Sequence, residues 1–244
     1  MKPVLILGAK SDMAKATAEF YAKNGWDLNL AGRNIITELS TFRDRLKDDY
    51  GCEINLYDLD ILDFKSHTEF FKSFQQKPDG VICFIGLLGD QQKSEMDFNE
   101  TKTVIDSNFT GIVSLLNIFA NYFEEKEDGF IVAVSSVAGD RGRKRNYTYG
   151  SAKAALTTYL SGLRNRLSPK NVHVMTVIPG FVETKMTKNL DLPSLITVSP
   201  NYVGKKIFEM QQRRADQIYI PGYWYFIMAF IKLIPERVFK KLNI

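Results

Sequence analysis

The chain has 244 residues, of which 45% are hydrophobic and 25% are charged, as in a globular protein that buries a full core. Its net charge of +4 is too small to indicate a nucleic-acid-binding protein. Two cysteines in no metal-like spacing and two histidines argue against a metal site, and they are typical of reduced thiols in a cytoplasmic protein.

Short apolar segments alternate along the chain with longer segments of helical periodicity. Several of the short segments are continuously apolar, as are strands buried on both faces of a parallel sheet. Repeated β-α units with short links predict one α/β domain, a Rossmann-type doubly wound parallel sheet of about seven strands. The expected strands are 4–7, 28–31, 53–57, 80–84, 130–135, 173–178 and 217–220, and the expected helices are 12–23, 34–49, 64–75, 99–124, 149–167 and 201–213.

The two ends of the chain carry no clear membrane-spanning signal. The first apolar run, 4–7, is shorter than the core of a signal peptide, and no stretch reaches the ~18 apolar residues of a spanning helix. We assign residues 1–218 to the nucleotide-binding domain and residues 219–244 to an aromatic, amphipathic tail. This tail either packs on its own domain or a subunit partner, or lies at a membrane surface with its basic residues on anionic lipid.

The first strand, turn and helix form a candidate nucleotide cradle, because such a turn presents backbone N–H groups to a pyrophosphate. A glycine-rich cradle would carry glycine at two positions where this chain has Asp12 and Ala14. The charge of Asp12 suits a helix N-terminus but repels phosphate, and Lys10 can offset it. Either Ser11 or Asp12 can cap the helix. The residues assigned to the cofactor turn are Gly8, Lys10, Ser11, Asp12 and Met13.

The second strand ends in Gly32 and Arg33. NAD-binding folds commonly carry an acidic residue here for the ribose 2′-hydroxyl. An arginine instead can bind a 2′-phosphate through charge-assisted hydrogen bonds. The sequence therefore favours NADP(H) over NAD(H).

Tyr149 and Lys153 are spaced by four residues within a predicted helix, so they share one face of it. A lysine beside a phenol stabilises the phenolate, and we expect a lowered pKa for Tyr149. Such a phenol can donate a proton to a developing alkoxide. Tyr147 lies off this face and is expected ahead of the helix.

The strand 130–135 ends in Ser135 and Ser136, which places a hydroxyl on the cofactor side of the sheet. With these motifs, the chain resembles the short-chain dehydrogenase/reductase family over about residues 1–213. In that family the catalytic serine lies 13 residues before the tyrosine, so Ser136 matches it. "VIDSNFTG" supplies the family's helix asparagine as Asn108.

Other family positions match in the same order along the chain. "LDILD" supplies the adenine-contacting acid, and "IPGFVETKM" supplies the proline–glycine cofactor turn. The family's Asn-Asn-Ala-Gly after the fourth strand is Cys83-Phe84-Ile85-Gly86 here, so only its glycine is carried over. The resemblance thus adds as cofactor-binding residues Asp60, Ile61, Gly86, Tyr149, Lys153, Pro179, Gly180, Val182 and Thr184.

The resemblance implies hydride transfer between a nicotinamide and a ketone or secondary alcohol. Tyr149 would be the general acid/base, and Lys153 would tune it and bind the nicotinamide ribose. Ser136 would hold the substrate oxygen, and Asn108 would hold a water in a proton relay. Family members commonly pair through two long helices, which here implies a homodimer or homotetramer through 99–124 and 149–167.

A basic run at 141–145 and the aromatic tail go beyond the general family pattern. Together they resemble the decaprenylphosphoryl-2-keto-ribose reductase branch, which reduces a keto sugar carried on a polyprenyl phosphate. This resemblance implies a cytoplasmic enzyme with peripheral contact at the inner face of a membrane. The alternatives are a reductase of a soluble ketone or 3-oxoacyl thioester, and a catalytically silent NADP(H)-binding sensor.

Overall fold

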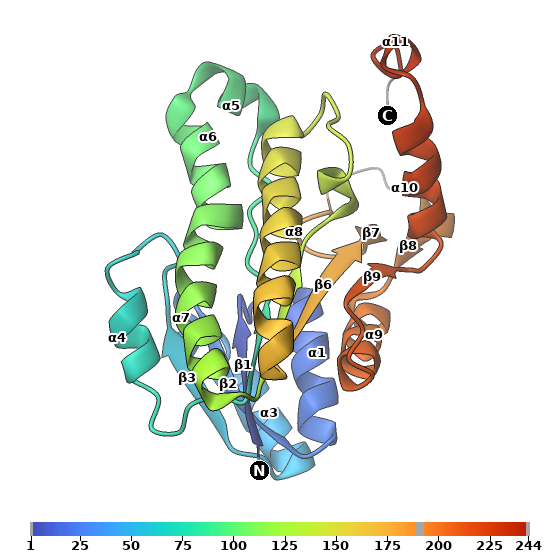
Figure 1. Cartoon of the computed structure of the whole chain (residues 1–244). Coiled ribbons are helices and arrows are strands. Elements are labelled where there is room, and N and C mark those ends of the chain that lie inside the picture. Colours follow the sequence, from blue (N-terminus) through green and yellow to red (C-terminus); the bar gives the residue numbers. More distant parts are fainter. Residues whose placement is uncertain (1, 189–192, 243–244) are drawn as a thin grey trace.

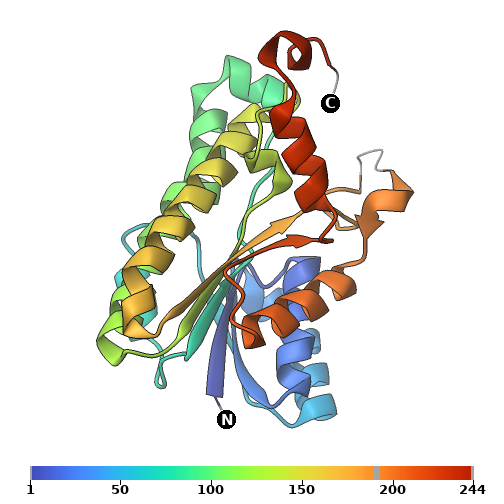
Figure 2. The same ribbon diagram turned by 45° about the vertical axis from the view of Figure 1, so that its right-hand side comes forward.

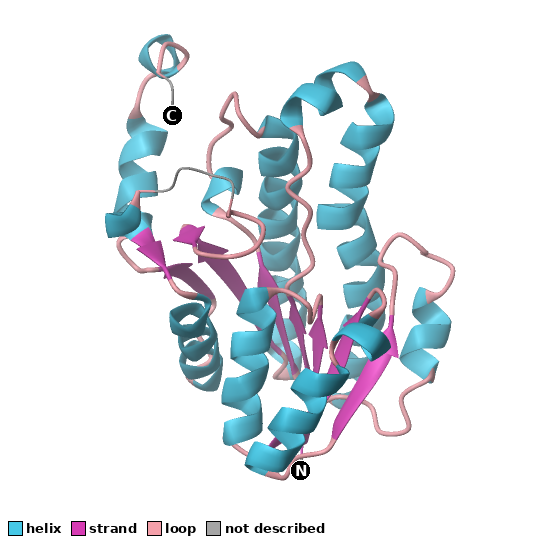
Figure 3. Ribbon diagram, turned by 180° about the vertical axis from the view of Figure 1, so that it is seen from behind, coloured by secondary structure: helices cyan, strands magenta, loops and turns pink. Residues whose placement is uncertain are grey.

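The computed structural model describes residues 2–188 and 193–242. Seven parallel strands form one sheet in the order β3-β2-β1-β4-β5-β6-β9, and helices cover both of its faces (Figures 1 and 3). The strand order reverses at β1, and ligands bind at such a switch point beside the carboxyl ends of the strands. The sheet strands are β1 Lys2–Leu7, β2 Trp26–Gly32, β3 Ile54–Asp58, β4 Gly80–Cys83, β5 Phe130–Val134, β6 His173–Pro179 and β9 Gln217–Ile220.

The helices and the short elements complete three layers. The strands β7 and β8 pair outside the main sheet, and the two last helices follow β9. The α-helices are α1 Asp12–Lys23, α2 Ile35–Glu38, α3 Ser40–Tyr50, α4 His67–Lys72, α5 Gln91–Met96, α6 Phe98–Ile105, α7 Gly111–Lys126, α8 Tyr147–Leu167, α9 Pro200–Gln212, α10 Trp224–Leu233 and α11 Glu236–Phe239. The other elements are β7 Phe181–Val182, β8 Thr197–Val198, the π-helical turn η1 Asp106–Thr110 and the 3₁₀ turns η2 Val137–Gly139, η3 Ser168–Lys170 and η4 Ser194–Ile196.

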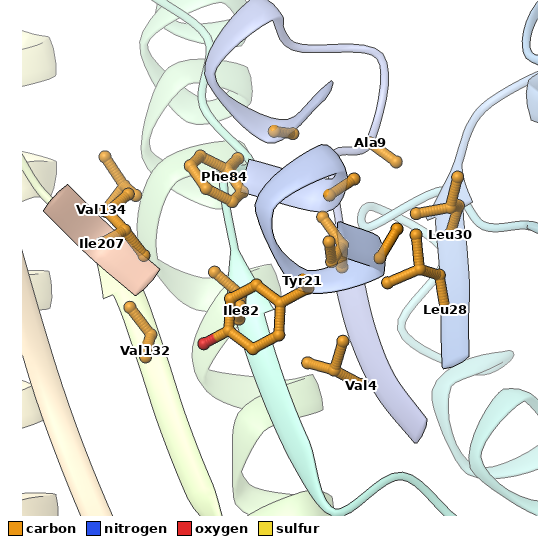
Figure 4. Close-up of a cluster of buried hydrophobic side chains, with 14 of the residues drawn as sticks. Val4, Ala9, Tyr21, Leu28, Leu30, Ile82, Phe84, Val132, Val134 and Ile207 are labelled. Carbon is orange, nitrogen blue, oxygen red and sulfur yellow. The ribbon is translucent and has the colours of Figure 1, made fainter. Parts of the chain in front are cut away.

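Alternate residues of the buried strands serve two separate cores, because successive side chains of a strand point to opposite faces. One face packs against α1, α3 and α9, and the other against α4, α7 and α8. Figure 4 shows Tyr21 of α1 among the side chains of β1, β2, β4 and β5. Its hydroxyl donates to Gln211 of α9 at 3.1 Å, which satisfies a phenol that is otherwise fully buried.

All seven expected strands are present, and the fold class is confirmed. The helix expected at 34–49 is divided at Leu39 into α2 and α3, and the helix expected at 99–124 contains the π-helical turn η1. Helix α8 begins two residues earlier than expected, so Tyr147 lies in its first turn. The tail expected at 219–244 forms the end of β9, α10 and α11, and its last two residues lie outside the described part of the chain.

One helical stretch, Phe98–Lys126, is long and apolar enough to cross a membrane by length and composition. It contains no unbroken run of ~18 apolar residues, because Asn, Thr, Ser and acidic residues interrupt it, so the sequence-based expectation about such runs is not contradicted. Half of its most apolar window is buried inside the protein, as in the core helix of a globular domain, so this stretch is weak support for a membrane span.

Candidate active site

Helix α8 places Tyr149 and Lys153 beside the carboxyl ends of β4 and β5. The Lys153 side chain is only 2% exposed, and its ammonium donates to the carbonyl oxygens of Val134 at 2.9 Å and of Ile85 at 3.4 Å. The Lys153 Nζ lies 5.8 Å from the centroid of the Tyr149 ring. The two side chains therefore share one helix face, as their spacing predicts.

Burial changes the acidity of both groups. Desolvation raises the pKa of Tyr149 to about 12, against the opposing effect of a hydrogen bond with Ser136. Desolvation also lowers the pKa of Lys153 to about 8. The expectation of a lowered Tyr149 pKa is thus wrong, because burial raises this pKa and the Lys153 ammonium is directed at two carbonyl groups. What the site has instead is an ammonium that gives up its proton easily.

The two serines at the end of β5 have different partners. The buried Ser135 donates to the carbonyl of Lys153 at 3.0 Å and shares a 2.7 Å hydrogen bond with Thr157, so it fastens α8 to the sheet. Ser136 begins the turn η2, where its hydroxyl accepts the N–H of Ala138 at 3.1 Å. The hydrogen bond between Ser136 and Tyr149 puts Ser136 on the side of the phenol, as the family spacing implies.

Asn108 lies in the π-helical turn η1, a distortion that is frequent at functional sites. Its side chain is fully buried, donates to the carbonyl groups of Leu87 at 2.7 Å and Val104 at 2.8 Å, and accepts the Leu87 N–H at 3.1 Å. A Cβ at Gly86 would lie 3.2 Å from Asn108 Oδ1 and 3.4 Å from Lys153 Nζ. These three residues therefore meet at one point, where a larger residue than glycine would crowd the lysine.

The first β-α turn is built for close approach of the backbone. Gly8 has φ +73°, and a Cβ there would come within 2.9 Å of the backbone nitrogen of Ile85. Ser11 occupies the N-cap position of α1, but its side chain makes no capping hydrogen bond, and Asp12 is the first helical residue. Ala14 and Met13 pack into the core behind the turn, with Ala14 fully buried.

Asp12 has a structural partner that the sequence did not indicate. Its carboxylate accepts the backbone N–H of Lys185 at 2.8 Å, which joins the first turn to the segment that follows β7. The sequence suggested that Lys10 could offset the charge of Asp12. Lys10 instead forms an ion pair with Glu38 at 2.7 Å. Asp12 therefore connects two segments that both flank the cofactor side of the sheet.

A pocket of about 760 Å³ opens beside the carboxyl ends of β2 and β3. Lys10, Arg33 and Asp60 line it, as expected for an adenosine-binding site, and Ile61 is buried just beyond Asp60. Arg33 is exposed and has no ion-pair partner among residues 2–188 and 193–242, so its guanidinium is available to an anion. The Asp60 carboxylate accepts the N–H of Leu62 at 3.0 Å, which fixes the loop after β3.

The residues fit a dinucleotide, because Lys10, Arg33 and Asp60 line the pocket and the glycines at 8 and 86 leave the ends of β1 and β4 free of side chains. Within the described residues, no group of three histidine, cysteine, aspartate or glutamate residues could hold a metal ion. The residues that would hold the nicotinamide end lie at the end of β6 and after it. Pro179 is the last residue of β6, and Val182 is buried in β7. The N–H of Thr184 donates to the Thr187 hydroxyl at 3.0 Å.

Gly180 is in contact with a tail residue that sequence reasoning missed. A Cβ at Gly180 would lie 1.9 Å from Trp224 Nε1, so the absence of a side chain at 180 makes room for this indole. Trp224 is 3% exposed and stacks edge-on with Phe181 at 5.1 Å between ring centroids. The many aromatic residues of the tail suggest that one of them is buried against the domain. No pattern in the sequence indicates that Trp224 contacts Gly180.

Helix α10 packs one face on the loop after Ser136, as Figure 2 shows. Trp224 and Met228 are buried there against Val137 and Ile178. The opposite face of α10 is exposed, with Phe226 at 72% and Leu233 at 80%. We call this surface the α10 outer face. It consists of Tyr225, Phe226, Phe230 and Leu233.

The basic run 141–145 is only partly a solvated loop. Arg141 donates to the backbone carbonyls of Ile231 at 2.6 Å and Ile234 at 2.7 Å, and it pairs with Glu236 at 3.0 Å. It therefore fastens the end of α10. Lys144 and Arg145 are exposed.

Comparisons with known proteins agree with this architecture. A family model described as short chain dehydrogenase matches residues 2–194. An uncharacterized oxidoreductase of Mycobacterium tuberculosis is 29% identical over 243 residues, covering 98% of this chain and 96% of that protein. The 3-oxoacyl-[acyl-carrier-protein] reductase of Chlamydia muridarum is 27% identical over 192 residues, covering 78% of this chain and 77% of that protein. A short-chain dehydrogenase from Sphingobium yanoikuyae, solved in complex with NADPH, superimposes with a TM-score of 0.82 at 21% identity and covers 97% of each chain.

Proposed function

The chain belongs to the short-chain dehydrogenase family and is an NAD(P)-dependent oxidoreductase, and from this premise we propose that it reduces a ketone to a secondary alcohol with NADPH. The observation that carries the proposal is the convergence of Tyr149, Lys153 and Asn108 with Ser136 at the carboxyl ends of β4 and β5. A nucleotide-binding protein that only senses its ligand has no need of this proton-transfer set.

Each of these residues has a distinct role in the proposed reaction. Ser136 and Tyr149 hold the substrate oxygen, and Tyr149 donates a proton to it as negative charge develops. Lys153 supplies the positive charge that stabilises the resulting phenolate, and its low pKa suits it to pass on a proton. Asn108 would help to hold a water beside Lys153 through an oxygen lone pair, since its two amide hydrogens are donated to Leu87 and Val104. A bound nicotinamide supplies the hydride.

We infer a preference for NADP(H) from Arg33. Its exposed guanidinium lines the pocket at the end of β2, where a 2′-phosphate would offer two charge-assisted hydrogen bonds. Lys10 lies in the same pocket but is shared with Glu38. Arg33 is therefore the main residue that would distinguish the two cofactors.

The substrate that we propose is a keto sugar carried on a polyprenyl phosphate. The α10 outer face offers exposed aromatic and aliphatic groups for a lipid chain, and Lys144 and Arg145 are exposed on the neighbouring loop. These features suit a cytoplasmic enzyme in peripheral contact with the inner face of a membrane. We also infer a homodimer or homotetramer through α7 and α8, which lie side by side in Figure 1.

Replacement of Tyr149 by phenylalanine tests the reaction, because this change removes only the hydroxyl. Turnover of a ketone panel with NADPH should fall about 10²- to 10⁴-fold, while the affinity for NADPH should change little. Unchanged turnover would refute the assignment. A replacement of Phe226 and Phe230 by serine tests the substrate class, since both are exposed and their loss should spare the fold.

The second candidate is reduction of a soluble 3-oxoacyl thioester, which the similarity to the Chlamydia muridarum reductase favours. With that substrate, the double serine variant should retain its activity and the protein should not sediment with anionic phospholipid vesicles. With a lipid-linked substrate, both activity and sedimentation should be lost in the variant. The two substrate classes are thus separated by one variant.

A further inference from the structure

The first turn of α8, which carries Tyr149, has no cap from its own N-terminal residue. The first backbone N–H groups of a helix have no partner within the helix, and the side chain at the N-cap position commonly accepts one of them. Asn146 occupies this position, but its side chain makes no capping hydrogen bond. The place of the capping group is therefore open to a side chain from another element.

Helix α5 supplies this group, although it lies far from α8 in the sequence. The Oε1 atom of Gln91 accepts the N–H of Thr148, 57 residues away, at 3.0 Å. One turn further along α5, the Glu95 carboxylate accepts the Tyr147 hydroxyl at 3.1 Å and the Gln91 side-chain N–H at 3.4 Å. Two side chains of α5 thus hold the two residues that directly precede Tyr149.

Helix α5 is itself fixed to the helix that carries Asn108. The Asn108 side chain bonds to both the N–H and the carbonyl of Leu87, in the loop that leads into α5. Glu100 of α6 accepts the N–H of Asp90, the N-cap residue of α5, at 3.2 Å. This segment therefore connects the surroundings of Asn108 with the start of α8 through a continuous set of hydrogen bonds.

Lys153 is held in place independently of α5. Its ammonium donates to two backbone carbonyls at the ends of β4 and β5, and the hydroxyls of Ser135 and Thr157 donate to its carbonyl oxygen at 3.0 Å each. Lys153 also lies one turn further into α8, where the backbone N–H groups have partners within the helix. Loss of the cap should therefore loosen Tyr149 and leave Lys153 where it is.

We propose that Gln91 is a positioning residue of the reaction, which caps α8 from α5 and so holds the Tyr149 hydroxyl at the substrate oxygen. The inference rests on the proposed function, because Gln91 acts through Tyr149. Proton donation requires the donor in a defined geometry, and a helix end without a cap unwinds more often. A loosened first turn lowers turnover without any change in the phenol itself.

Variants of α5 test this role with NADPH and the ketone panel. Gln91→Ala removes the acceptor and should lower kcat roughly 3- to 10-fold, while the Kd for NADPH should change less than about twofold. Gln91→Glu keeps an oxygen acceptor at the helix N-terminus and should restore most of the turnover. Gln92→Ala is the matched control, since Gln92 is an exposed neighbour of the same residue type, and it should behave as the wild-type protein.

Hydrogen exchange measures the cap without recourse to activity. The amide of Thr148 should exchange faster in Gln91→Ala than in Gln92→Ala, whereas the amide of Thr157, in the middle of α8, should be unaffected. Equal exchange at Thr148 in these two variants would overturn the proposal, as would equal turnover in Gln91→Ala and Gln91→Glu. If Tyr149→Phe is inactive while Gln91→Ala is unimpaired, only the positioning role fails; if Tyr149→Phe is fully active, the proposed function itself fails.

Discussion

The buried ammonium of Lys153 gives the stability of this protein a measurable dependence on pH. Burial lowers the pKa of Lys153 to about 8, whereas the unfolded chain keeps the ordinary value of 10.5. Between these values the unfolded chain binds more protons, so the free energy of unfolding rises with pH. The destabilisation is fully present below about pH 8 and is relieved above about pH 10.5.

The interval between the two pKa values corresponds to about 3 kcal/mol, of which about 2 kcal/mol falls between about pH 8 and pH 10. We expect the difference in unfolding free energy between Lys153→Met and the wild-type protein to shift by this amount over that range. The change leaves the carbonyls of Val134 and Ile85 without a donor. This loss destabilises the variant by the same amount at pH 8 and at pH 10, so it does not alter the shift. The charge of Lys153 lowers the raised pKa of Cys83, so both proteins are compared in a Cys83→Ala background, where this coupling is absent.

Guanidinium chloride unfolding at several pH values, followed by circular dichroism, measures this difference. Lys126→Met is the control. A hydrogen bond with Asp79 raises the pKa of Lys126, so the stabilisation by this pair is lost only above the ordinary lysine pKa and should stay constant over the measured range. A difference between Lys153→Met and the wild-type protein that stays constant from about pH 7 to pH 10 would refute the claim that Lys153 is desolvated.

Three further changes examine the contacts around the cofactor side. Asp12→Ala should increase hydrogen exchange at the amide of Lys185, because it removes the acceptor of that N–H. Asp12→Asn keeps an acceptor and should leave the exchange unchanged. Equal exchange rates in the two variants would contradict the contact. Gly180→Ala should lower the free energy of unfolding in urea by about 1–3 kcal/mol, because its Cβ would overlap Trp224, and an unchanged midpoint would contradict this packing. Arg33→Gln should raise the KM for NADPH roughly 10- to 100-fold and leave the KM for NADH nearly unchanged, and equal effects on both would remove the NADP(H) preference.

The sequence predicted those features that depend on local pattern. Apolar runs indicated the strands of the sheet most clearly where the strand is buried on both faces, as in β1, β4, β5 and β6. The four-residue spacing placed Tyr149 and Lys153 on one helix face. The choice of Ser136 came from the resemblance to the family and stays a prediction, and the structure gives the neighbouring Ser135 hydrogen bonds to Lys153 and Thr157.

Features that depend on long-range packing were not accessible in this way. Asp12 and Lys185 are separated by 173 residues, and no pattern joins them. The direction of the Tyr149 pKa was predicted wrongly because spacing reports which groups are neighbours but not how much water surrounds them. The break at Leu39 in the helix expected at 34–49 was also missed, since no glycine or proline marks it.

The basic run 141–145, the turn at Gly180 and the aromatic tail are connected through α10. Trp224 at its start fills the space over Gly180, Met228 contacts Arg143, and Arg141 bonds to the carbonyls at its end. Since Gly180 belongs to the turn assigned to the cofactor and the two arginines belong to the loop between Ser136 and Tyr149, α10 joins both sides of the candidate site. A displacement of α10 must therefore move the loop that carries the substrate-side residues together with the cofactor turn. For this reason, we expect changes on its inner face to affect ketone and cofactor binding at once, and changes on the α10 outer face to affect neither for a water-soluble ketone.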